Sequence, residues 1–155
     1  MRKNKIYFAS PFFNSEQVER EERVKSELRK LKFNVWSPKE FMHCKSDCSD
    51  EERRMAFEGN TKNIVDSEIL YAITDGKDMG TIWEAGFANG YNLDKDKKDK
   101  IKIIYYCETL GDNPFNLMLS ESADIIITSQ EMLKMLPTLI KSLDERSYKY
   151  VGKIE

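Results

Sequence analysis

Short apolar segments of strand length alternate with longer segments of helical pattern along this chain, and that alternation restricts its fold more than any other feature. The apolar segments are rich in β-branched and aromatic residues and end at turn formers; they span residues 5–9, 33–36, 69–74, 101–107 and 124–128. Strands separated by helices pair in parallel, and helices then cover both faces of the sheet. The sequence therefore predicts an α/β fold, a single-domain Rossmann- or flavodoxin-like three-layer α/β/α sandwich with a five-stranded parallel sheet.

The helical segments carry recognisable start and stop signals. Ser49 or Asp50 is expected to cap one helix and Thr81 to cap another, because short polar side chains satisfy free backbone N–H groups. Pro137 is expected to kink or split the last helix. The predicted helices span residues 14–31, 50–65, 81–91 and 130–144, with a short helix between the fourth and fifth strands.

Composition excludes several classes of protein. A chain of 155 residues fits one domain, residues 1–155, and its net charge of −2 argues against a nucleic-acid partner. No apolar run reaches the roughly 20 residues of a membrane helix, so no membrane association is expected. The basic, then apolar start is interrupted by Ser10 and Pro11, unlike a signal peptide. With three cysteines and no export signal, we expect reduced thiols and a cytoplasmic location.

Ligands of open parallel sheets bind beyond the carboxyl ends of the strands, and one loop there is rich in chemistry. Residues 74–89 read TDGKDMGTIWEAGFAN and lead from a strand into a helix. Gly80 allows the backbone to approach a ligand, Glu84 falls on the first turn of the expected helix, and Asp78 precedes it by six residues. The segment matches neither the dinucleotide nor the triphosphate glycine motif.

Two carboxylates in one crevice suit chemistry at a sugar's anomeric carbon. One carboxylate attacks that carbon and forms a covalent ester, while neighbouring groups hold the sugar and assist the leaving group. An anion beneath the ring also stabilises the oxocarbenium-like transition state. The alternatives are structural: Glu84 as a partner of the helix dipole, and Asp78 as a turn former.

Five segments together resemble the nucleoside 2-deoxyribosyltransferase family, in its order and with nearly its spacing. They are KIYFASPFF, the stretch from Asn60 to Ile64, DMGTIWEAGFANG, NPFNLM and YKYVG near the end of the chain. The resemblance implies a ping-pong transfer of a 2-deoxyribosyl group between nucleobases through a glutamate ester. It also implies that 2′-deoxynucleosides and free nucleobases are the substrates, and that no metal or organic cofactor is needed.

The resemblance also implies roles for individual residues. Glu84 is the nucleophile that takes C1′, Asp78 hydrogen-bonds sugar hydroxyls, and the Tyr7 hydroxyl contacts the nucleophilic carboxylate. Asn116 is donated by a neighbouring subunit to the sugar's 5′-hydroxyl, with Met118 at the same interface. The protein is then a homo-oligomer, a dimer or trimer of dimers with shared active sites. From the residues alone, Tyr7 also suits the core and Asn116 also suits a helix cap.

Other positions are less determined by the resemblance. Asn60 stands where some members carry aspartate; an amide can hydrogen-bond a base but cannot act as a general acid. Phe13, with Phe12 and Trp83, is either a wall for the base or part of the core. The terminal carboxylate of Glu155 is expected to approach the site.

The sequence also allows two rival functions and one possible metal site to be compared with this interpretation. A 2′-deoxynucleoside 5′-monophosphate N-glycosidase would use the same glutamate, but it needs a phosphate pocket of serines and amides, whereas the loop SPFFNSE is aromatic. A non-catalytic nucleotide-binding or flavodoxin-like module would need a hydroxyl- and glycine-rich loop at that place. His43, Cys44 and Cys48 lack the paired short spacings of structural zinc sites, so no metal is expected.

Overall fold

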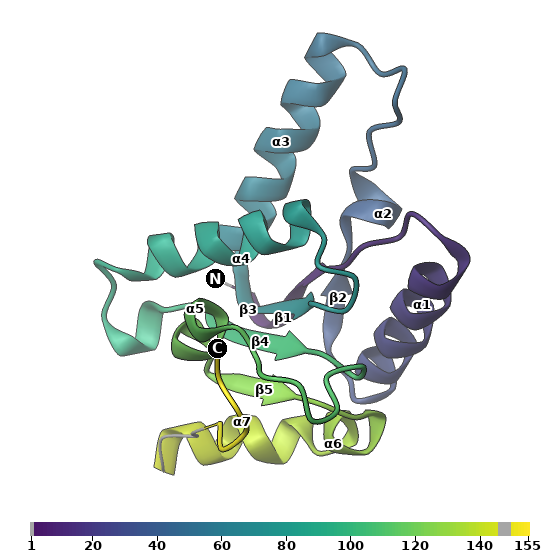
Figure 1. Ribbon diagram of the computed structural model, residues 1–155. Coiled ribbons are helices and arrows are strands. Elements are labelled where there is room, and N and C mark those ends of the chain that lie inside the picture. Colours follow the sequence, from purple (N-terminus) through teal and green to yellow (C-terminus); the bar gives the residue numbers. More distant parts are fainter. Residues whose placement is uncertain (1, 146–149) are drawn as a thin grey trace.

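One parallel sheet forms the centre of the protein. The computed structural model describes residues 2–145 and 150–155. The sheet holds five strands in the order β2-β1-β3-β4-β5, all parallel (Figure 1). They are β1 (Arg2–Ala9), β2 (Asn34–Trp36), β3 (Ser67–Ile73), β4 (Lys102–Tyr106) and β5 (Ile125–Ile127). This is the flavodoxin-like order, in which ligands bind where the chain reverses its direction across the sheet, between β1 and β3.

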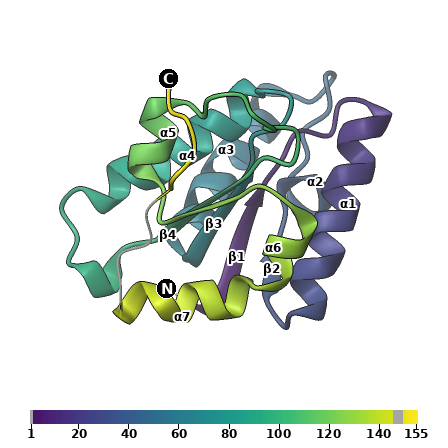
Figure 2. The same ribbon diagram turned by 60° about the horizontal axis from the view of Figure 1, so that its bottom comes forward.

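Helices cover both faces of the sheet, which confirms the predicted three-layer sandwich. On one side lie α1 (Ser15–Lys30), α6 (Gln130–Lys134) and α7 (Leu136–Glu145) (Figure 2). On the other side lie α3 (Asp50–Val65), α4 (Met79–Asn92) and α5 (Leu117–Ser122). Side chains alternate along β1, so Ile6 and Phe8 pack towards α1 while Tyr7 and Ala9 pack towards α4. Tyr7 therefore points into the layer that carries Glu84.

The helix starts follow local side-chain chemistry, with one correction. Ser49 caps α3 as predicted, and it forms a capping box with Glu52. Thr81 does not cap α4; the cap is Asp78, whose carboxylate accepts the Thr81 N–H at 2.7 Å. Because a carboxylate at this position satisfies a free N–H group of the first turn, α4 begins two residues earlier than expected, at Met79.

Proline splits the last helical segment, as predicted. Helix α6 ends at Lys134 and α7 begins at Leu136, with Pro137 in the first turn of α7, where no N–H is needed. Two short helices were not predicted: α2 (Pro38–Phe41) and the 3-10 turn η1 (Lys97–Asp99). Both lie between the predicted helices and strands. Tyr148 and Lys149 of the YKYVG motif lie outside the described residues.

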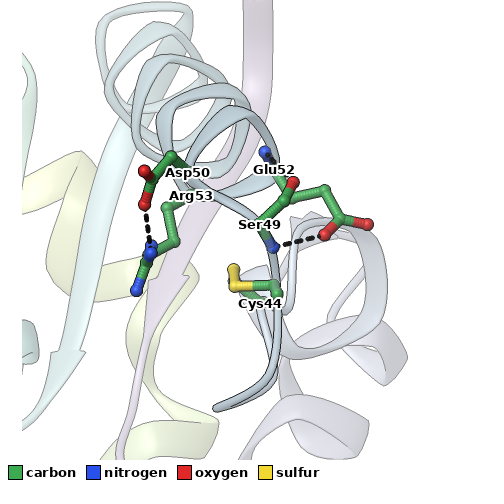
Figure 3. The surroundings of a disulfide bond; sticks show 6 residues. Cys44, Ser49, Asp50, Glu52 and Arg53 are labelled. Carbon is green, nitrogen blue, oxygen red and sulfur yellow. Dashed lines mark hydrogen bonds and ion pairs between the residues drawn. A yellow bond between two sulfur atoms is a disulfide. The ribbon is translucent and has the colours of Figure 1, made fainter.

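A disulfide joins Cys44 to Cys48, so the expectation of reduced thiols is wrong for this pair. A turn in which the Cys48 N–H donates to the Lys45 carbonyl brings the two Cα atoms to 5.9 Å, within the range that a disulfide spans. Figure 3 shows the bond beside the start of α3, next to the contacts between Ser49 and Glu52 and between Asp50 and Arg53. Cys107 is a buried free thiol. Among the described residues, no helix is long and apolar enough to cross a membrane.

A thiol count tests the disulfide. Denatured protein labelled with a maleimide before reduction should carry one label, on Cys107, and three after reduction, because only Cys107 is free in the fold. Mass spectrometry of the intact chain and of its peptides gives both counts. The Cys107→Ser variant is the control, with no label before reduction. Three labels on unreduced wild-type protein, purified without reductant, would contradict the pairing.

Candidate active site

A tyrosine of β1 and a glutamate of α4 meet on the face of the sheet that α4 covers. The Tyr7 hydroxyl donates a hydrogen bond to Oε1 of Glu84 at 2.5 Å. Tyr7 is completely buried in the sheet, and Glu84 lies in the second turn of α4, because that helix starts at Met79. The contact that the family resemblance implied is thus present, although the glutamate sits one turn deeper in its helix than expected.

Burial changes the acid–base behaviour of this pair. Removal from water is the largest influence on Glu84 and raises its pKa to about 7; the Tyr7 hydrogen bond lowers it, and the charge of Asp78 raises it further. Burial, together with the neighbouring Glu84, raises the pKa of Tyr7 far above its usual value. Tyr7 therefore remains a hydrogen-bond donor, while Glu84 can gain or lose its proton near neutral pH.

Asp78 caps α4, and its carboxylate can still accept further hydrogen bonds. Its Oδ2 atom accepts both the Thr81 N–H, at 2.7 Å, and the Thr81 hydroxyl, at 2.9 Å. A carboxylate has about four acceptor sites, so capping leaves room for hydroxyls of a ligand. A Cβ at Gly80 would lie 3.2 Å from the same Oδ2. Glycine at this position therefore makes space for the Asp78 carboxylate.

Asn60 lies in α3, in the layer that α3 and α4 form, and its side-chain oxygen is a buried acceptor. Its Oδ1 atom is buried and has no hydrogen-bond partner among the described residues. An unsatisfied buried acceptor costs about 1–3 kcal/mol, which a donor on a ligand would recover. The Asn60 amide oxygen is therefore free to accept an N–H or O–H donor.

Phe13 and Trp83 belong to two separate groups of aromatic side chains. Phe13, which is 73% exposed, stacks on Phe12, and Phe12 meets His43 edge-on at 5.0 Å. Trp83 is also exposed and contacts Phe57 of α3 and Phe87 of α4. Phe13 is thus not part of the core.

Sequence reasoning missed one aromatic of the site. Trp36, at the carboxyl end of β2, stacks on the Tyr7 ring with 5.2 Å between centroids. The sequence did offer a signal for this residue: Trp36 directly precedes Ser37–Pro38, where a strand ends beside the expected ligand position.

Asn116 and Met118 line a different place, a cavity of about 510 Å³. Asn116 caps α5 by accepting the Leu119 N–H at 3.2 Å, as its alternative interpretation predicted. Glu155 lines the same cavity, and its backbone pairs with Phe115 and Leu117. None of Tyr7, Asp78 and Glu84 is among the lining residues. The contacts of the described residues thus do not join Asn116 or Met118 to Tyr7 or Glu84, although Lys77 and Ile82, which lie on either side of Asp78 in the sequence, line the same cavity.

The segment 43–48 offers no metal site. Both of its cysteine sulfurs are engaged in the disulfide, and the described part of the chain contains no group of three or more potential metal ligands.

Both the sequence and the fold of the chain match known proteins. The model of the nucleoside 2-deoxyribosyltransferase family matches residues 6–126, a range that includes Tyr7, Asn60, Asp78, Glu84 and Asn116. The chain belongs to this family. A solved 2-deoxyribosyltransferase from the psychrotolerant bacterium Bacillus psychrosaccharolyticus matches with a TM-score of 0.73 and 28% identity, over 87% of this chain and 95% of that one.

A second solved structure, described as a conserved protein from Enterococcus faecalis V583, matches the fold of this family member. Its TM-score is 0.67 at 20% identity, over 89% of this chain and 98% of that one. No curated protein matches the chain. The assignment of the chain to the family thus rests on the match over residues 6–126 and on the structural likeness to a 2-deoxyribosyltransferase.

The raised pKa of Glu84 predicts a specific pH dependence of stability. Its folded-state pKa of about 7 lies above the ordinary value, so its contribution to stability is complete below about pH 4.5 and is lost as the pH rises through 7. The neutral isostere Glu84→Gln should equal wild type at low pH and exceed its unfolding free energy by about 1–3 kcal/mol at pH 8.

Urea unfolding of both proteins from pH 4.5 to 8.5 measures this difference. In Tyr7→Phe, which lacks the hydrogen bond that lowers the pKa, the transition should move to higher pH. A difference between wild type and Glu84→Gln that stays constant over the range would contradict the prediction.

Proposed function

We propose that this protein is a nucleoside 2-deoxyribosyltransferase in which Glu84 is the nucleophile. The observation that carries the proposal is the 2.5 Å hydrogen bond from Tyr7 to Glu84, made by a carboxylate whose pKa is raised to about 7. Membership of the family supports nucleosides as the substrate class. Together these observations favour a reactive carboxylate over a glutamate that only balances a helix dipole.

The first half-reaction forms an ester. A 2′-deoxynucleoside binds with C1′ over Glu84, and Tyr7 holds Oε1 so that the other carboxylate oxygen faces C1′. That oxygen forms a bond to C1′ while the C1′–N bond breaks, and the departing base keeps the electron pair and takes up a proton. The negative charge of Glu84 stabilises the oxocarbenium-like transition state, and Asp78 accepts hydrogen bonds from sugar hydroxyls.

The second half-reaction reverses the first with a new base. A nitrogen of the incoming base attacks C1′, the ester bond breaks, the carboxylate is released, and the base loses a proton. Two displacements at C1′ retain its configuration. Asn60 contributes recognition of the base, because an amide has no proton to transfer at neutral pH, and water supplies the proton for the leaving base.

A second copy of the chain completes the site in this proposal. Asn116 and Met118 line a cavity without Glu84, and the apolar side chain of Met118 is 74% exposed. Exposed apolar side chains mark interaction surfaces where they are grouped, and α4 and α5, which cover the same face of the sheet, carry four of them, Met79, Trp83, Leu117 and Met118. We therefore infer a homo-oligomer in which Asn116 serves the neighbouring Glu84.

Base exchange tests the proposal directly. Wild-type protein incubated with deoxyinosine and adenine should produce deoxyadenosine and hypoxanthine. Chromatography of the reaction mixture measures both products. Glu84→Gln should lose at least about 1000-fold in rate, because it cannot form the ester, while its far-ultraviolet circular dichroism stays unchanged.

Three results would contradict the proposal. One is unchanged exchange by Glu84→Gln. A second is hydrolysis of a 2′-deoxynucleoside 5′-monophosphate without base exchange, which would indicate the N-glycosidase. The third is wild-type protein that binds nucleosides but turns over neither substrate, which would indicate a binding module.

Hybrid oligomers test the shared site. Chains carrying Asn116→Ala and chains carrying Glu84→Gln, co-expressed with different tags and purified through both, should regain about half of wild-type activity if they form dimers. One of the two sites then combines an intact Glu84 with an intact Asn116. Each parent variant alone is the control. Hybrids no more active than the average of their parents would rule out sharing.

A further inference from the structure

Three aromatic rings form a column that starts at the Tyr7–Glu84 contact. Tyr7 and Trp36 are direct neighbours on the parallel strands β1 and β2, and their rings stack with 5.2 Å between centroids and 28° between planes. The other neighbour of Trp36 is Phe41 of α2, at 5.8 Å and 16°. Tyr7 is completely buried, whereas Phe41 is 59% exposed. The column thus leads from the buried Tyr7 ring, beside the partly buried Glu84, to the surface.

Helix α2, at the outer end of the column, depends on support from elsewhere. It has four residues, and helices this short are not stable in isolation. Glu40 of α2 pairs with Lys25 at 3.0 Å and with Arg29 at 2.6 Å, and Lys39 pairs with Glu21 at 2.9 Å. Charges removed from water must be paired, and Lys25 and Glu21 are almost completely buried. Ion pairs to α1 therefore hold α2, and with it Phe41, against Trp36.

The Tyr7 side chain has two constraints on its orientation. Its hydroxyl is bonded to Glu84, and one face of its ring rests on the Trp36 indole. If the indole were absent, the ring could tilt into the vacated space, and the hydroxyl would move away from Oε1. A displacement of about 1 Å in such a site can cost up to about 100-fold in rate.

From these contacts we infer that Trp36 is a positioning residue, which keeps the Tyr7 hydroxyl on Glu84, and that α2 is its support. The inference rests on the proposed function of Glu84. Trp36 acts through Tyr7, so its effect on the reaction exists only while Tyr7 carries its hydroxyl. This dependence distinguishes positioning from a general contribution to stability and from direct binding of a base.

A double-mutant cycle measures the dependence. In base exchange, Trp36→Leu should lower kcat about tenfold with little change in KM, and Tyr7→Phe should lower it by a similar or larger factor. In the Tyr7→Phe background, Trp36→Leu should have almost no further effect. Trp36→Phe preserves the stack and should retain most of the activity. Additive losses in the cycle would overturn the inference, as would a loss confined to KM.

Two further variants separate positioning from folding. Phe33→Leu is the matched control, because Phe33 lies beside the start of β2 and packs on the opposite face of the sheet; it should lower the unfolding free energy and leave kcat unchanged. Phe41→Leu removes the exposed end of the column and keeps the protein folded. It should cause a two- to threefold loss in kcat that also disappears with Tyr7→Phe, so the inference is testable even if Trp36→Leu does not fold.

The outcomes also separate this inference from the proposed function. If Glu84→Gln abolishes exchange and Tyr7→Phe impairs it, but Trp36→Leu and Phe41→Leu change nothing, only the positioning role is wrong. If Glu84→Gln leaves exchange intact, the nucleophile itself is wrong.

Discussion

One partly buried hydrogen bond, from Tyr7 to Glu84, is the constraint on which the proposed chemistry depends. Burial makes ionisation of Glu84 unfavourable, and the tyrosine hydroxyl partly offsets that cost. The result is a carboxylate that ionises near neutral pH, fixed through one oxygen and free to react through the other. The fold provides this by joining two segments that are 77 residues apart in sequence.

The sheet order explains why these two side chains meet. Strand β1 pairs with both β2 and β3, so Tyr7 lies between Trp36 of β2 and Leu70 of β3. Helix α4 follows β3 and returns across the face that Tyr7 points to, which places Glu84 opposite the hydroxyl. On its other side, Tyr7 contacts Trp36 of β2. The same topology thus supplies the reactive group and the rings that orient its partner.

Much of this arrangement was accessible from sequence because it depends on local patterns. The sequence predicts the strands because buried parallel strands are continuously apolar, as in Ile125–Ile127, and it predicts that Glu84 lies near the start of a helix because its motif links a strand to a helix. Features that need several segments at once were missed. Helix α2 is held by ion pairs with α1, and the stacking of Trp36 requires the β1–β2 register. Asp78 rather than the predicted Thr81 caps α4, because the Asp78 carboxylate is positioned to accept a hydrogen bond from the Thr81 N–H.

The most direct test of this account is to trap the sugar on the protein. A 2′-fluorinated deoxynucleoside slows both displacements and should let the ester accumulate, so that intact-mass analysis shows one added fluorinated sugar per chain. Peptide mapping should place it on Glu84, and Glu84→Gln should remain unlabelled. A label on another residue, or base exchange at full rate without any label, would contradict the account.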